Sequence, residues 1–157
     1  MIRYGFGIDF HKLEKGKELL LGGITITRKF GAIGDSDADV VLHSLSDAIL
    51  SAVCKGDLGT IFYKKKGYKS IDMVRFIIDK FLGNKYKIAQ INVIIFLEKP
   101  LLFDKKEKIK RALSKLLFID VNSINIQAKT FQRLLSNIVL ALSSVIVIEN
   151  TNSASFV

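Results

Sequence analysis

The chain has 157 residues, of which 49% are hydrophobic and 25% charged, a balance typical of one folded domain that excludes an intrinsically disordered chain. Cys54 is the only cysteine, which excludes an intrachain disulfide and favours a reducing compartment, and the most apolar stretch, residues 138–148, is shorter than the roughly 20 residues that span a bilayer. The net charge of +9 fits phosphate-bearing partners, but all except five of the 24 basic residues are Lys, which fits a solvated surface at least as well.

The N-terminal part of the chain predicts β-structure. Residues 2–10 are mostly apolar and contain Gly5 and Gly7, which indicates a strand that another backbone or a ligand approaches closely. Residues 19–21 and 24–27 are β-prone runs on either side of a Gly-Gly pair, the pattern of a hairpin.

The clearest helix is expected to open at Ser36. Its hydroxyl can cap the helix, and Asp39 would then occupy the third helical position, as in a capping box with Asp in place of Glu. Apolar residues from Val40 to Val53 follow a 3.6-residue period, and Gly56 is expected to end the helix.

The remaining elements alternate between helix and strand. We expect helices over 70–82 and 104–117, strands over 86–97 and 124–130, and a last apolar segment over 138–148 that reads as a strand or, almost as well, as a buried helix. This order predicts an α/β (α+β) two-layer sandwich, in which about three helices cover one face of a mixed sheet and a small β-hairpin is added. One domain is expected over 1–157.

Both histidines of the chain lie where they can join a metal site. Asp9 and His11 are two residues apart on the first predicted strand, so both side chains leave the same face. His43 lies on the predicted helix, one turn from both Asp39 and Asp47. A carboxylate and two imidazoles suit zinc, although the same pattern fits a hydrogen-bonded pair on the strand and a solvated polar face on the helix.

Five short motifs occur in order over the first 60 residues, and together they resemble the N-terminal signature of the 2-C-methyl-D-erythritol 2,4-cyclodiphosphate synthase family. The match is dense through residue 62 and thinner to about residue 134. The motifs are Gly7-Ile8-Asp9-Phe10-His11-Lys12-Leu13, Leu21-Gly22-Gly23-Ile24, Ser36-Asp37-Ala38-Asp39-Val40-Val41-Leu42-His43, Ser46-Asp47-Ala48 and Gly56-Asp57-Leu58-Gly59.

This resemblance implies a homotrimer with active sites at the subunit boundaries and Zn²⁺, or another divalent ion, on Asp9, His11 and His43. It implies cyclisation of 4-diphosphocytidyl-2-C-methyl-D-erythritol 2-phosphate with release of CMP, in the non-mevalonate isoprenoid pathway. The expected partner is this small molecule, with no nucleic acid and no membrane. The expected compartment is the bacterial cytoplasm or a plastid-type organelle.

The resemblance also implies roles for individual residues. Ser36 stands at a phosphate-contact position, Thr130 at that of a threonine that stabilises the transition state, and Asp57 where the family contacts methylerythritol hydroxyls. The segment 98–103 corresponds to a loop whose backbone receives cytosine. The other expected substrate-binding residues are Leu58, Gly59, Phe62, Pro100, Lys129 and Gln132.

The chain departs from the family pattern mainly at phosphate-binding positions. Asp35 stands at a catalytic position where the family usually has His, and Lys64-Lys65-Lys66 replaces an acidic loop and could hold phosphates or be solvated. Gln132 replaces the Glu that holds a second Mg²⁺ or Mn²⁺, and an amide oxygen is a poorer ligand for a hard dication. Leu101 replaces a frequent Lys, and the Gly-Arg-Gly turn before residue 138 is missing.

Three functions are therefore open at this point. The chain is a divergent active synthase, a non-catalytic zinc-bound trimer that binds cytidine nucleotides, or a basic nucleic-acid-binding domain. The last is motivated by the +9 charge and the three consecutive lysines, but no recognised DNA- or RNA-binding motif supports it.

Overall fold

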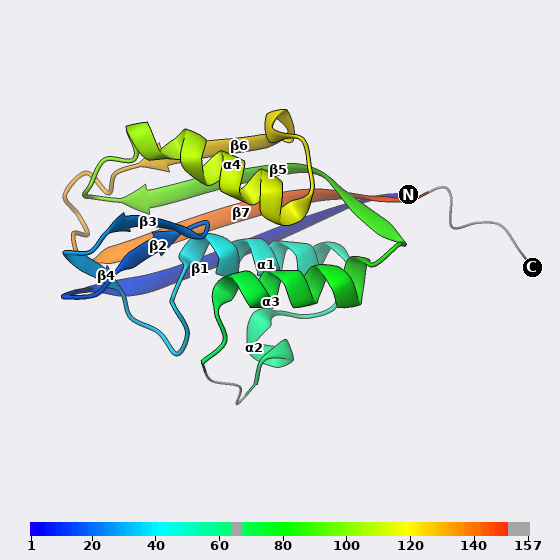
Figure 1. Ribbon diagram of the computed structural model, residues 1–157, viewed down its shortest axis with the longest axis horizontal. Helices are drawn as coiled ribbons and strands as arrows, with labels where there is room; N and C mark the ends of the chain where they lie inside the picture. Colours follow the sequence, from blue (N-terminus) through cyan, green and yellow to red (C-terminus); the bar gives the residue numbers. More distant parts are fainter. Residues whose placement is uncertain (64–66, 151–157) are drawn as a thin grey trace, which may run out of the picture.

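A computed structural model describes residues 1–63 and 67–150 of the chain. Five strands form a mixed sheet in the order β4-β1-β7-β5-β6, and two more form a separate hairpin (Figure 1). Only the β5–β6 pair is parallel; the other three pairs in the sheet are antiparallel. The strands are β1 (Ile2–Lys15), β2 (Leu19–Leu21), β3 (Ile24–Thr27), β4 (Phe30–Ala32), β5 (Tyr86–Leu97), β6 (Ile124–Lys129) and β7 (Ile138–Glu149).

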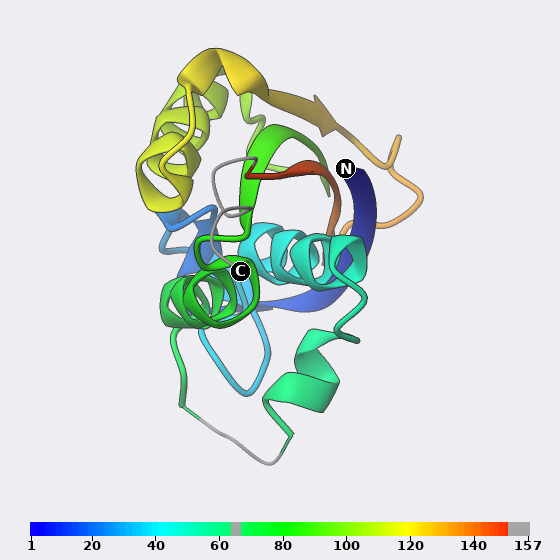
Figure 2. The ribbon, with the colours of Figure 1, turned by 90° about the vertical axis from the view of Figure 1, so that its right-hand side faces the viewer.

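Within the described part of the chain there are four α-helices. They lie on one side of the curved sheet, as the end-on view shows (Figure 2). The helix α1 packs on β1 and β7, α4 packs on β6, and α3 packs on α1. The expected number of about three helices missed the short α2. The α-helices are α1 (Val40–Ala52), α2 (Leu58–Ile61), α3 (Ser70–Ile77) and α4 (Lys106–Leu117).

Several predicted boundaries moved. The first strand continues to Lys15, because its second half pairs with both β7 and β4. The predicted helix 70–82 forms as α3 followed by a π-helical turn, Ile78–Leu82, and ends at Gly83 as expected. The predicted helix 104–117 forms as a 3₁₀ turn, Phe103–Lys105, that continues into α4. The segment left open between strand and helix is β7, in the middle of the sheet.

The start of the long helix was predicted wrongly. The cap is Asp39, not Ser36, and α1 begins at Val40. The Asp39 carboxylate accepts hydrogen bonds from the backbone N–H groups of Val41 and Leu42, which fixes the first turn. It also accepts from Gly22 at 2.9 Å and Gly23 at 2.7 Å, so the same side chain ties the β2–β3 turn to the helix. Asp39 rather than Ser36 caps the helix because its carboxylate also binds the β2–β3 turn, whereas Ser36 offers only one hydroxyl group.

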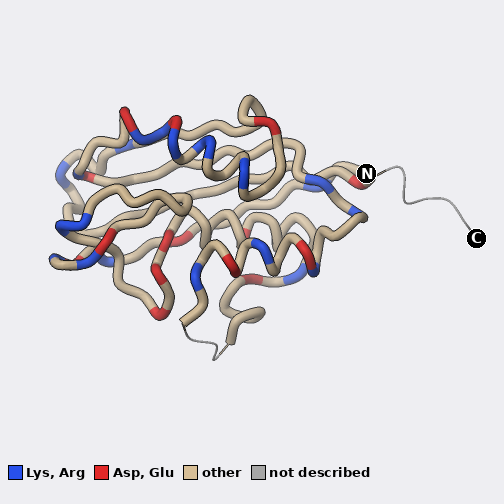
Figure 3. Tube along the Cα trace, viewed as in Figure 1, with Lys and Arg blue, Asp and Glu red and all other residues tan. Residues whose placement is uncertain are grey.

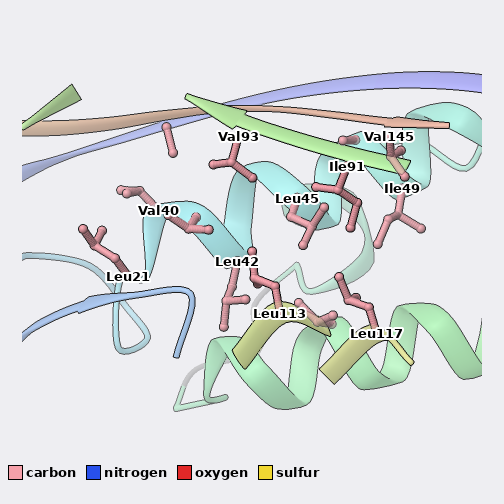
Figure 4. Packing of buried hydrophobic residues seen from close by; sticks show 14 of the residues in the cluster. Leu21, Val40, Leu42, Leu45, Ile49, Ile91, Val93, Leu113, Leu117 and Val145 are labelled. Carbon is pink, nitrogen blue, oxygen red and sulfur yellow. The ribbon is translucent and has the colours of Figure 1, made fainter. Parts of the chain in front are cut away.

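The core lies between the sheet and its helices. Alternate residues of β5 and β7 are buried against α1, and Figure 4 shows these side chains meeting leucines of α1 and α4. Burial of each such side chain contributes about 1.5–3 kcal/mol to stability. The central members are Leu42, Leu45, Ile49, Ile91, Val93, Leu113 and Val145.

Charged side chains are distributed over the surface. Figure 3 shows Lys and Arg along α4 and at the loop ends, interspersed with Asp and Glu. Among residues 1–63 and 67–150, no helix is both long and apolar enough to cross a membrane.

Candidate metal centre and active site

The helix-facing side of β1 carries alternate residues Gly5, Gly7, Asp9 and His11. A Cβ atom at Gly7 would overlap the backbone carbonyl oxygen of Ser44 on α1, and one at Gly5 would overlap that of the next turn of α1. The two glycines therefore let the helix lie directly on the strand, as their presence in the strand predicted. This close approach brings the next polar residues of β1 beside His43.

Asp9, His11 and His43 converge, as the sequence predicted. The Asp9 Oδ2 atom lies 3.0 Å from His11 Nε2 and 3.1 Å from His43 Nδ1, and the two nitrogens are 3.4 Å apart. All three side chains are between 14% and 24% exposed, so the cluster is shielded but reachable from solvent. Among the described residues, this is the group of His, Cys, Asp and Glu side chains positioned to hold one metal ion.

The orientation of His11 is set by the backbone of the loop after β4. Its Nδ1–H donates to the carbonyl oxygen of Ile33 at 2.7 Å. Because a carbonyl can only accept, this bond assigns the proton to Nδ1 and leaves the Nε2 lone pair facing Asp9. A second hydrogen bond of this kind is a usual feature of metal-binding histidines.

The opposite edge of the His43 ring faces two hydroxyl groups. His43 Nε2 lies 3.2 Å from the Ser36 Oγ atom and 2.9 Å from the Ser70 Oγ atom, the latter at the start of α3. The Ser36 hydroxyl oxygen also accepts a hydrogen bond from the Ala38 N–H. Ser36 was predicted to cap the helix, but it lies beside the Asp9–His11–His43 cluster instead. Ser70 was missed by sequence reasoning, because it lies 27 residues from His43 and outside any metal-ligand spacing.

The charges of the cluster favour a bound cation. Burial raises the pKa of Asp9, but hydrogen bonds and attraction to His11 and His43 outweigh this and lower it to about 2. The hydrogen bond to Asp9 raises the pKa of His11 above its ordinary value of 6.5. Both shifts show that the cluster favours positive charge next to the Asp9 carboxylate.

The donor set fits zinc. An ionised carboxylate oxygen and a histidine nitrogen that carries no proton are both acceptors, so neither can bond to the other. Their approach to about 3 Å is favourable when a proton or a metal cation lies between them. Two imidazoles and one carboxylate are three of the four ligands of a catalytic zinc site, and the fourth position is left for substrate or water.

The segment around Asp57 is held next to α1 by Asp47. The Asp47 carboxylate accepts a hydrogen bond from the Leu58 N–H at 2.7 Å. Asp57 caps the short α2 through a 2.7 Å bond from the Thr60 N–H, and this bond lowers the pKa of its exposed carboxyl. Gly59 is also exposed, so this turn presents a carboxylate and backbone to solvent. The predicted helical stripe placed Asp47 beside His43 but did not indicate this anchoring role.

A second candidate binding region lies where β5 and β6 end. A pocket of about 180 Å³ is formed by the loop after β5 and the end of β6. Glu98 joins the two strand ends, because its carboxylate accepts from the Phe131 N–H at 3.0 Å and the Arg133 N–H at 3.3 Å. The pocket is lined by Leu97, Leu101, Leu102, Phe103, Lys106, Ala128, Lys129 and Thr130, and therefore not by the metal cluster.

Other predicted site residues occupy varied positions. Phe62 is 8% exposed, and its ring packs edge-to-face against the more exposed rings of Tyr68 and Phe76. Asp35 is exposed in the loop before α1, and Gln132 donates a 3.1 Å hydrogen bond to the Thr130 hydroxyl. Pro100 lies in the loop after β5. The three consecutive lysines, 64–66, lie outside the described residues.

Comparisons with known proteins agree with this arrangement. The model of the YgbB family matches residues 2–148. The 2-C-methyl-D-erythritol 2,4-cyclodiphosphate synthase of Clostridium acetobutylicum is 39% identical over 133 residues, which cover 82% of this chain and 86% of that protein. The synthase of Solibacter usitatus is 36% identical over 136 residues, covering 84% and 86%. A solved structure of such a synthase in its CDP-bound form superposes with a TM-score of 0.88 at 31% identity, over 93% of this chain and all of that one. The chain therefore belongs to the YgbB family, that of the 2-C-methyl-D-erythritol 2,4-cyclodiphosphate synthases.

Proposed function

We propose that this protein is a metal-dependent lyase that converts 4-diphosphocytidyl-2-C-methyl-D-erythritol 2-phosphate to 2-C-methyl-D-erythritol 2,4-cyclodiphosphate and CMP. The observation that carries the proposal is the convergence of Asp9, His11 and His43, which brings one carboxylate oxygen and two ring nitrogens within 3.4 Å of one another. Family membership supports the reaction class.

The reaction joins two anionic groups. An oxygen of the 2-phosphate attacks the outer phosphorus of the diphosphate, a new P–O–P bond closes the ring, and the bond to the CMP phosphate oxygen breaks. Zn²⁺ bound by the three side chains supplies Lewis-acid stabilisation of the phosphate oxygens. The Ser36 hydroxyl lies beside His43 and can donate to a phosphate oxygen, and the exposed Asp57 carboxylate can accept from the methylerythritol hydroxyls.

The pocket beside Thr130 suits the cytidine part of the substrate. Its walls are largely apolar side chains from the loop after β5, which can cover a flat base. Lys129 and Thr130 at its edge offer a cation and a hydroxyl to the diphosphate, and Gln132 and Pro100 lie in the two adjoining loops. We assign Phe62 a packing role at the end of α2, because its ring is buried.

A homotrimer accounts for the outer face of the sheet. The side of β1 that faces away from the helices exposes a row of large apolar residues, with Phe6 and Ile8 each 50% and Phe10 65% exposed. The row continues across β7, where Phe10 is paired with Leu140 and Ile8 with Leu142. Apolar surface of this extent is usually covered by a partner. Subunits joined through this face could bring the pocket beside Thr130 of one chain close to the Asp9–His11–His43 cluster of the next.

Two observations favour a second candidate function, a zinc-bound trimer that binds cytidine nucleotides without turnover. The Gln132 amide is turned to the Thr130 hydroxyl, so its neutral side chain offers little to a second Mg²⁺ or Mn²⁺. Asp35 is acidic and exposed next to the proposed phosphate site, where a carboxylate repels the substrate.

Incubation of the purified protein with substrate, Zn²⁺ and Mg²⁺, with CMP and cyclic product measured, tests the first function. We expect CMP release that disappears in His43→Ala. CMP at the level of the His43→Ala control would contradict the synthase assignment. Calorimetric titration with CDP tests the second function, because CDP binding without CMP formation would support the non-catalytic trimer and no measurable CDP binding would dismiss it.

A further inference from the structure

Behind the Asp9–His11–His43 cluster, a series of hydrogen bonds runs from His43 to the start of α3. His43 Nε2 lies 2.9 Å from the Ser70 Oγ atom. The Ser70 hydroxyl in turn donates to the Asp37 carboxylate, which also accepts from the Ser70 backbone N–H. Ser70 is 1% exposed, so water does not compete for these bonds.

The position of each proton in this chain follows from what each group can donate. An ionised carboxylate only accepts, so the Ser70 hydroxyl proton is directed at Asp37. The Ser70 oxygen can then only accept from His43, which requires a proton on His43 Nε2. In the neutral ring, the lone pair is consequently on Nδ1, the nitrogen that lies 3.1 Å from Asp9 Oδ2.

We propose that Asp37 and Ser70 are positioning residues, which hold His43 in the tautomer and ring orientation that present Nδ1 to the metal. The inference rests on the proposed metal site, and it assigns to His43 what the Ile33 carbonyl does for His11. Loss of such a supporting partner typically costs about 10–100-fold in metal affinity. Since Ser70 is the first residue of α3, the placement of this helix also sets the geometry of a metal ligand.

A purely structural role is the competing explanation. The cap residue of α3, Lys69, makes no side-chain capping bond, and Asp37 satisfies the first N–H of the helix instead. On that explanation, loss of Asp37 or Ser70 lowers stability but leaves zinc affinity and the His43 tautomer unchanged. The two explanations are therefore separated by measurements on the metal site itself.

The test compares Ser70→Ala, Asp37→Ala and Ser70→Thr with the wild type. Zinc affinity is measured by competition with a chromophoric chelator, and ¹⁵N NMR of labelled histidine reports which ring nitrogen carries the proton. The chain has only two histidines, so the spectra are readily assigned. Ser46→Ala is the matched control, because Ser46 is a buried serine whose hydroxyl has no hydrogen-bond partner among the described residues.

We expect Ser70→Ala to lose about 10–100-fold in zinc affinity, and Ser70→Thr, which keeps a hydroxyl, to remain within about threefold of wild type. Asp37→Ala should free the Ser70 proton to turn to His43 Nε2 and shift the neutral ring toward the Nδ1–H tautomer. Circular dichroism checks that each variant is folded. Zinc affinity within about twofold of wild type in folded Ser70→Ala, or an unchanged tautomer in Asp37→Ala, would overturn the inference.

These outcomes are distinguishable from failure of the proposed function. A wild-type protein that binds no zinc would overturn both the metal-dependent reaction and the role of Ser70. A zinc-binding wild type with insensitive variants would overturn only the positioning role, and the CMP assay would still decide the reaction.

Discussion

Removal of the Asp39 carboxylate is expected to destabilise the protein at two places at once. In Asp39→Ala, the N–H groups of Val41 and Leu42 lose the helix cap, which costs about 0.5–2 kcal/mol. The buried Gly22 N–H is left without its acceptor, at about 1–3 kcal/mol, whereas the exposed Gly23 N–H can turn to water. Burial raises the pKa of Asp39, because desolvation of its carboxylate is unfavourable. This cost offsets part of the stabilisation from the hydrogen bonds, and Asp39→Ala removes both. We therefore expect a net loss of about 2–4 kcal/mol.

Two further variants sharpen this prediction. Asp39→Asn keeps the oxygen that accepts from Gly22, Val41 and Leu42 and places an amide only opposite Gly23, so it should cost about 0.5–1.5 kcal/mol. Asp120→Ala is the matched control, because Asp120 caps an exposed 3₁₀ turn through a single bond from the Asn122 N–H. It should change the free energy of unfolding by less than about 1 kcal/mol.

Urea unfolding of metal-free protein measures these differences without a contribution from metal binding, and one protomer concentration for all variants keeps the contribution of assembly comparable. The expected order of destabilisation is Asp39→Ala, then Asp39→Asn, then Asp120→Ala. Equal losses in the two Asp39 variants, or an Asp39→Ala loss below about 0.5 kcal/mol, would refute the assignment of a double anchoring role to this carboxylate.

Three further predictions concern the site and the outer face. Gly7→Ala should force α1 away from β1, because the new methyl group meets the Ser44 carbonyl oxygen. We expect the free energy of unfolding to fall by at least about 1–3 kcal/mol and zinc binding to weaken. The control Gly59→Ala has room for a methyl group and should change neither stability nor zinc binding. Because the pKa of His11 is raised above 6.5 in the folded protein, protonation of His11 stabilises the metal-free protein. This stabilisation is fully present below pH 6.5 and is lost as the pH rises through the higher pKa of the folded state. Zinc competes with the same proton, so the zinc-induced rise in Tm should grow from about pH 6 to 8, and a pH-independent rise would contradict the assignment. Phe6→Asp places a charge in the exposed apolar face, and sedimentation should show smaller species than for the wild type; an unchanged mass would argue against assembly through this face.

Local geometry predicted that Asp9 and His11 share one face of a strand, but the full ligand set with His43 was predicted from the family resemblance. The alternation of a strand puts Asp9 and His11 on one face whatever the rest of the chain does, and the paired glycines indicate where a helix can lie on that face. The hairpin was predictable for the same reason, since a Gly-Gly pair between two β-prone runs is a local signal. The strand face and the hairpin depend on residues within a few positions of one another, whereas His43 lies 32 residues from His11 and 34 residues from Asp9.

The start of α1 and the surroundings of the ligands were decided by tertiary contacts. Ser36 and Asp39 are both good caps by sequence, and the choice of Asp39 depends on two glycine N–H groups that reach it from 16 and 17 residues away. The partnership of Ser70 with His43 spans 27 residues and exists only because α3 packs on α1. A sequence thus fixes which atoms can donate and accept, but the partner of each atom depends on the packing of distant elements, which brings together groups that no local spacing relates.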